Sequence, residues 1–229
     1  MPTPDASSAP PVLLVHGFAA SADRTWRDNG WVDLLGDLGR DVLAIDLLGH
    51  GDADKPHDPA AYADLEADVA GALPAGPVDA VAFSLGARVL LRVAAADPSR
   101  FRRIVVAGVG DNLFRRDDPE PIARAIAEGA SEDDRVGQHF ALLAAAPGND
   151  PLALAACLRR PSPPLTADEL RSLDRPVLVV LGDRDFAGPA DPLLAALPDA
   201  RLVTLRNVDH FATPKAMGFL DAALDFLEG

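Results

Sequence analysis

The feature that most constrains the fold is a set of six short apolar runs without polar alternation. They lie at Val12–Val15, Val42–Ile45, Val78–Phe83, Ile104–Ala107, Val177–Leu181 and Leu202–Leu205. Runs of this length, rich in Val, Leu and Ile, are typical of strands buried on both faces. Between them, apolar residues recur every three or four positions, which predicts helices. The alternation predicts an α/β fold: a mostly parallel sheet of about six or more strands, flanked by helices.

One segment, residues 112–175, interrupts this alternation. It contains no convincing strand, and its Gly and Pro residues divide it into two or three short helical patterns. We therefore expect a single domain over residues 1–229 with a short helical lid inserted at residues 112–175. Within the insertion, Thr166 and Glu169 have the spacing of a capping box. The first ten residues, rich in Pro, Ser and Ala, predict a flexible tail.

Composition narrows the class of protein. The chain is 48% apolar and 24% charged, as in soluble globular proteins, and its net charge of −14 opposes binding to nucleic acid and to anionic membranes. It shows neither a membrane-spanning stretch nor a secretory signal, so we expect a cytoplasmic monomer or small homo-oligomer. Cys157 is the single cysteine, which excludes an internal disulfide, and the five histidines lack metal-ligand spacing. We expect no metal.

The stretch "VDAVAFSLGARVLLRV" places Ser84 between a buried strand and a helix. Reactive groups of parallel sheets lie at the carboxyl ends of strands. The small residues Ala82 and Gly86 permit a sharp turn that would expose the Ser84 hydroxyl at the positive end of a helix. The Leu85 amide would then be free to stabilise an oxyanion. A simpler alternative, that Ser84 is only a helix N-cap, stays open.

Two later stretches supply the groups that a serine nucleophile needs. A hydroxyl requires a base within hydrogen-bond reach, and the base requires a carboxylate to orient it. "LGDRDF" and "NVDHF" each follow a predicted strand and provide acids and His210. The order serine, acid, histidine is the order of the α/β-hydrolase triad.

The sequence resembles the α/β-hydrolase superfamily, in particular serine esterase-like and lactonase-like members with a compact lid. The resemblance runs from about residue 10 to the last helix. It is carried by "LLVHGF", "DLLGHGDADKP", "AFSLGA", "LGDRD" and "VDHF". The chain departs from the family pattern at Ala53, where serine is usual, and at Ala82, where glycine is usual.

The resemblance assigns roles to five residues. It implies that Ser84 is the nucleophile, His210 the base and Asp185 the acid, with the backbone amides of Phe18 and Leu85 forming the oxyanion hole. Asp183 and Asp111 remain alternatives for the acid. The resemblance makes His16 a structural residue of its turn, and we interpret His50 as a loop anchor.

The resemblance implies hydrolysis of carboxylic esters or lactones of small to medium acyl groups through an acyl-enzyme on Ser84, without a cofactor. One alternative is a carbon-carbon bond hydrolase of ketone-containing ring-cleavage products. Another is a small-molecule receptor that retains the triad. Some apolar residues of the lid either line an acyl pocket or pack the lid itself: Phe114, Phe140, Leu142, Leu143 and Leu158.

Overall fold

The computed structural model describes residues 9–229, so most of the predicted tail over residues 1–10 lies outside the described residues. Six strands form one parallel sheet in the order β2-β1-β3-β4-β5-β6. Their bounds are β1 (Val12–Val15), β2 (Val42–Ile45), β3 (Val78–Phe83), β4 (Phe101–Ala107), β5 (Val177–Gly182) and β6 (Ala200–Leu205). The predicted fold class is confirmed.

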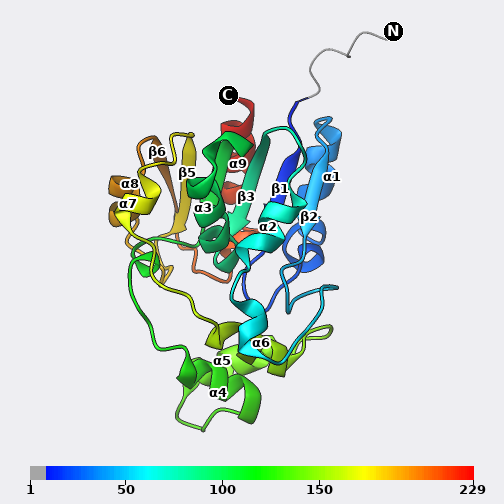
Figure 1. Cartoon of the computed structure of the whole chain (residues 1–229), viewed down its shortest axis with the longest axis vertical. Coiled ribbons are helices and arrows are strands. Elements are labelled where there is room, and N and C mark those ends of the chain that lie inside the picture. The colour runs from blue at the N-terminus through cyan, green and yellow to red at the C-terminus, as the bar shows by residue number, and fades with distance from the viewer. Residues whose placement is uncertain (1–8) are drawn as a thin grey trace.

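Helices cover both faces of the sheet (Figure 1). One face carries α2 (Glu66–Ala72), α3 (Leu85–Ala96), α7 (Ala167–Leu170) and α8 (Asp191–Ala196), and the other carries α1 (Trp31–Asp37) and α9 (Met217–Glu228). The described part of the chain has no helix with the length and apolar character needed to cross a bilayer. Single turns of 3₁₀ or π helix lie at Asp23–Arg27, Pro59–Tyr62, Pro98–Arg100, Asp111–Leu113 and Thr213–Lys215.

Strand β3 shows how the sheet divides the core into two layers. Its side chains alternate, so that Ala80 and Ala82 join the cluster under α3 while Val81 and Phe83 join the cluster under α9. In the second cluster, the rings of Trp31 and Phe219 lie 4.7 Å apart between centroids. Burial of apolar surface on both faces therefore fixes the central strands, including the one that ends at Ser84.

The edge strands depart from the sequence-based prediction. The central strands β1, β3 and β5 are buried on both faces as predicted, but β2 is only half buried and β6 is largely exposed. Each edge strand has a neighbour on one side only, which leaves more of its surface in contact with solvent. Strand β4 also begins at Phe101, before the predicted start at Ile104, because the charged Arg102 finds a partner at the amino end of the sheet.

The segment over residues 112–175 folds as helices, as the pattern predicted. Helices α4 (Glu120–Glu128), α5 (Arg135–Ala144) and α6 (Pro151–Arg159) gather at one end of the molecule (Figure 1). We refer to these three as the lid helices; that they act as a lid remains a prediction. They enclose a small apolar cluster that includes Ile126 and Leu154. The predicted capping box is present at the start of α7, where the chain returns to the sheet.

Candidate active site

Ser84 occupies a strained turn between β3 and α3. Its backbone has φ 52° and ψ −111°, a combination that non-glycine residues rarely adopt and that proteins retain mainly at functional sites. The Ser84 N–H donates to the Ala107 carbonyl at 2.9 Å, and the Gly86 N–H donates to the His16 carbonyl at 3.1 Å. A Cβ at Gly86 would lie 2.4 Å from that same carbonyl oxygen, so the turn requires glycine there.

The Ser84 side chain does not cap α3, which rules out the simple N-cap alternative. Instead, Ser84 Oγ lies 2.9 Å from His210 Nε2. On the other side of the ring, His210 Nδ1 lies 2.9 Å and 3.1 Å from the two carboxylate oxygens of Asp185. Because a carboxylate accepts, Nδ1 carries the ring proton and Nε2 is left to accept one from Ser84.

The carboxylate of Asp185 is held rigidly. Its side chain is fully buried, and its Oδ1 also accepts the Ala187 N–H at 2.9 Å. The other two candidate acids are engaged elsewhere. Asp183 accepts the Asn207 N–H at 2.7 Å, and Asp111 pairs with Arg115 at 3.3 Å. Of the three candidates, Asp185 is the one hydrogen-bonded to His210.

Two backbone amides flank the serine. Phe18 follows Gly17 at the end of β1, and Leu85 is the first residue of α3. Neither amide has an acceptor among the turn and loop hydrogen bonds of residues 9–229. The positive end of α3 adds its partial charge at Leu85. These donors are available to a negatively charged oxygen next to Ser84.

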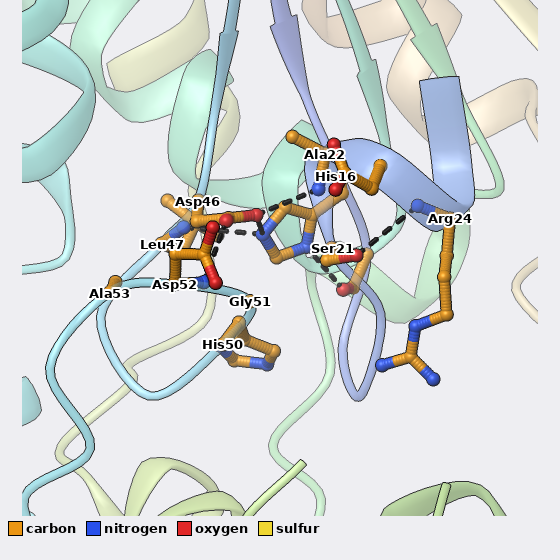
Figure 2. A network of polar contacts seen from close by, with 12 residues as sticks. His16, Ser21, Ala22, Arg24, Asp46, Leu47, His50, Gly51, Asp52 and Ala53 are labelled. Atoms are coloured by element: carbon orange, nitrogen blue, oxygen red, sulfur yellow. Dashed lines mark hydrogen bonds and ion pairs between the residues drawn. The ribbon is translucent and has the colours of Figure 1, made fainter. Parts of the chain in front are cut away.

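The turn that carries Phe18 is fastened by the network in Figure 2. The Leu47 N–H donates to His16 Nε2 at 3.2 Å, so Nδ1 carries the proton and donates to the Gly17 carbonyl at 2.8 Å. Burial lowers the pKa of His16, which keeps the ring neutral as this pattern requires. The structural role expected for His16 agrees with these contacts.

The loop after β2 completes this network. Asp46 Oδ1 accepts the Ala22 N–H at 2.7 Å and Oδ2 accepts the Asp52 N–H at 2.9 Å (Figure 2). His50 is fully buried in the same loop, with its Nδ1 donating to the Leu48 carbonyl at 3.0 Å. Burial lowers the pKa of His50 to about 3. His50 thus anchors the loop as a neutral ring.

Asn149, in the loop between α5 and α6, is a contact that sequence reasoning missed. Its Nδ2 donates to the Ala19 carbonyl at 3.1 Å, and its Oδ1 accepts from Arg24 Nη2 at 2.6 Å. Ala19 follows Phe18 and has a positive φ of 54°. A single asparagine in a loop carries no signal of this partner, so only the folded structure shows that the lid segment is tied to the turn of Phe18.

Two cavities meet at Ser84. One, of about 370 Å³, we call the aromatic cavity, because its lining includes Phe18, Phe83, Phe140, Phe186, His210 and Phe211; Arg24 and Lys215 also line it. The other, of about 600 Å³, is lined by Phe18 as well and by several arginines. The five apolar residues that were expected to line an acyl pocket or to pack the lid differ in position. Phe140, Leu143 and Leu158 line these cavities, Phe114 packs against the core, and Leu142 is 74% exposed.

Two further groups bear on the chemistry of the site. Cys157 is buried with a free thiol, and burial raises its pKa to about 11, so the thiol stays protonated near neutral pH. Within residues 9–229, no three His, Cys, Asp or Glu side chains are grouped so that they could hold a metal ion.

Comparison with known proteins agrees with the fold. The chain is 30% identical over 249 residues to a pimeloyl-[acyl-carrier protein] methyl ester esterase of Neisseria meningitidis, with 95% of this chain and 93% of that protein covered. A bromoperoxidase structure from Bacillus anthracis superposes with a TM-score of 0.76 at 20% identity, covering 97% and 93% of the two chains. For a carboxylesterase structure from Nitrososphaera gargenis the TM-score is 0.75 at 21% identity, covering 98% and 91%.

A shorter match links the chain to larger proteins. It is 36% identical over 108 residues to an uncharacterized protein of Mycobacterium tuberculosis, and the match spans 46% of this chain and 30% of that protein. The sequence pattern of the α/β hydrolase family, in contrast, matches residues 12–223, nearly the whole chain. The chain therefore belongs to the α/β hydrolase family.

Proposed function

We propose that this protein is a serine hydrolase that cleaves carboxylic esters or lactones of small to medium acyl groups through an acyl-enzyme on Ser84. The observation that carries the proposal is the continuous hydrogen-bonded chain from Ser84 through His210 to Asp185, beside two amides that have no acceptor among the loop and turn hydrogen bonds of residues 9–229. Ester chemistry is further supported by the Neisseria relative, which is named a methyl ester esterase.

In the first half of the reaction, Ser84 Oγ attacks the ester carbonyl carbon while His210 Nε2 takes its proton. Asp185 holds the imidazole in the correct tautomer and stabilises its positive charge. The amides of Phe18 and Leu85 donate to the oxyanion that forms on the carbonyl oxygen. His210 then protonates the departing alcohol oxygen, and the carbon-oxygen bond breaks to leave the acyl group on Ser84.

In the second half, water takes the place of the alcohol. His210 removes a proton from the water as its oxygen attacks the acyl carbon, and the Ser84 ester bond breaks as His210 returns that proton to Oγ. The acid product leaves and the free enzyme is restored. These steps use side chains, backbone amides and water.

The two cavities give the substrate an orientation. The leaving oxygen has to reach His210 Nε2, and His210 lines the aromatic cavity but not the arginine-lined one. The alcohol part therefore lies in the aromatic cavity. The acyl part lies in the other cavity, beside Leu85 at the start of α3.

The test is hydrolysis of a 4-nitrophenyl ester series from acetate to long chains, with fluorophosphonate labelling of wild type and Ser84→Ala. We expect turnover to peak at short or medium chains and kcat/KM to fall by about 10⁴ or more in Ser84→Ala. Near wild-type hydrolysis by that variant would overturn the proposal. Labelling of Ser84 without turnover of any ester would favour the receptor alternative.

A second candidate is hydrolysis of a carbon-carbon bond next to a ketone in a ring-cleavage product. One observation favours it, because Phe140, Phe186 and Phe211 surround the cavity next to His210 and would pack against an aromatic ring. Such substrates absorb strongly, so loss of their absorbance measures the reaction. A kcat/KM above that of every simple ester would place this candidate first.

A further inference from the structure

The arginine-lined cavity is unusual in a chain with a net charge of −14. Four arginines line it, with Asp117 as its one acidic lining residue among the described part of the chain. The four are Arg88, Arg115, Arg116 and Arg160. Because the rest of the chain is acidic, this concentration of positive charge next to Ser84 calls for a specific explanation.

Two of these arginines, Arg88 and Arg160, are partly buried and lack a carboxylate partner. Arg88 Nη2 donates to the Asn112 carbonyl at 2.9 Å, and Arg160 Nη1 donates to the Cys157 carbonyl at 2.6 Å. Both bonds are to neutral backbone oxygens. Within residues 9–229, no carboxylate oxygen lies within 4.0 Å of either guanidinium.

Arginines elsewhere in the molecule are partnered differently. Arg159, next in sequence to Arg160, donates to the Glu120 carboxylate through Nε and Nη2, each at 2.9 Å. On the surface, Arg171 pairs with Asp168 at 2.7 Å. Other arginines of the chain therefore do find carboxylate partners. We refer to Arg88 and Arg160, which have none within residues 9–229, as the inner arginines.

The surroundings of Arg88 disfavour its positive form. Burial and the nearby charges of Arg160 and Arg92 lower the pKa of Arg88, and the weaker opposing effect of Asp117 does not cancel this shift. A bound carboxylate would stabilise the positive form of Arg88, because a guanidinium group donates two charge-assisted hydrogen bonds that match the carboxylate oxygens.

Position relates this pair to the reaction. Arg88 lies in the first turn of α3, where its N–H donates to the Ser84 carbonyl at 3.0 Å, and both residues line this cavity. Arg160 reaches the same cavity from the end of α6. An acyl chain that starts at Ser84 Oγ and enters this cavity would end within reach of both.

We propose that the acyl part of the substrate ends in a carboxylate bound by Arg88 and Arg160, so that the substrate is a monoester of a short dicarboxylic acid. The inference rests on the proposed function and specifies its substrate class. Water adds across the ester carbon-oxygen bond, and the products are the alcohol, the dicarboxylate and one proton. The arginines bind the acyl group and take no part in the transfer of protons.

The experiment compares methyl hydrogen succinate, glutarate and adipate with methyl esters of the same shape that end in a carboxamide. We expect the wild type to prefer a carboxylate-ended ester by about tenfold or more in kcat/KM. Arg88→Gln and Arg160→Gln should each reduce that preference by about tenfold, chiefly through KM, and Arg160→Lys should restore part of it. Arg171→Gln, on the exposed surface, is the matched control and should keep the preference.

The outcomes separate this inference from the proposed function. One outcome is that Ser84 is needed for hydrolysis but kcat/KM is the same for the carboxamide and carboxylate esters. This outcome would overturn the inference and leave the proposed function standing. If no ester is hydrolysed, calorimetric titration with glutarate, adipate and inorganic phosphate still decides. Dicarboxylate binding that both glutamine variants lose supports the inference; no binding, or tighter binding of phosphate, contradicts it.

Discussion

A polar side chain lies near each end of strand β3, and the two are partnered in opposite ways. Near the amino end, Asp79 is fully buried and is bound by the guanidinium groups of Arg40 and Arg102. Just past the carboxyl end, Ser84 stands on a strained backbone, with its hydroxyl bonded to His210. The same strand therefore supports two kinds of polar site.

The difference lies in what each end leaves available. At Asp79 the charges satisfy one another, and the hydrogen bond to Asp79 raises the pKa of Arg102. Near Ser84, the amides of Phe18 and Leu85 have no acceptor among the loop and turn hydrogen bonds of the described residues. Arg88 and Arg160, which line the cavity beside Ser84, have no carboxylate partner there either. A buried polar group whose hydrogen bonds are all made holds the structure rigid. A site whose donors have no acceptor in the protein can donate to a ligand.

The largest effect that would sharpen this comparison is expected for Asp185→Asn. The amide would favour the wrong tautomer of His210, so kcat for ester hydrolysis should fall by about 10⁴. The free energy of unfolding, measured in urea, should change far less, because asparagine retains the shape and the acceptor for the Ala187 amide. Asp111→Asn is the matched control, and a larger loss there would move the role of the acid to Asp111.

The opposite end of the strand should respond in stability rather than in activity. Asp79→Ala leaves Arg40 and Arg102 without their shared carboxylate, and we expect it to lower the free energy of unfolding by about 3–5 kcal/mol. Urea denaturation measures this change, with Asp183→Ala as the control. A fall in kcat per folded molecule would show that the two ends are not independent.

Acid should also weaken the structure around the active site through His50. Its pKa is about 3 in the folded protein and about 6.5 when unfolded, so the unfolded state takes up the proton first as pH falls. Neutral His50 stabilises the folded protein fully above pH 6.5. As the pH falls, this contribution is lost progressively, and the loss is about 2 kcal/mol at pH 5. Denaturation at several pH values should show a shallower dependence in His50→Asn than in wild type, while exposed His139→Gln should follow wild type.

The smallest effect concerns the contact between the lid segment and the turn of Phe18. Asn149→Ala removes the bond to the Ala19 carbonyl, and we expect kcat to fall by about tenfold with little change in KM, a loss of about 1.4 kcal/mol. Gln138→Ala is the matched control, because Gln138 bonds only carbonyls within the lid segment. Equal kinetics for the two variants would show that the contact does not position the turn.

Much of the fold could be predicted because its signals are local. The apolar runs at Val12–Val15 and Val78–Phe83 coincide with the strands, and Thr166 with Glu169 forms the predicted capping box. The edge strand β6 was predicted less well. Its exposure depends on having no neighbour on one side, and a run of residues carries no information about its neighbours.

By itself, the sequence determined the alternation of strands and helices and the placement of Ser84 in a sharp turn, because periodicity and small flanking residues act over a few positions. Only the tertiary structure decided that Asp185, rather than Asp183 or Asp111, bonds His210, and that Arg88 and Arg160 share a cavity. The physical reason is distance along the chain: Ser84 and His210 meet across 126 residues, and such a contact exists only after the sheet has assembled.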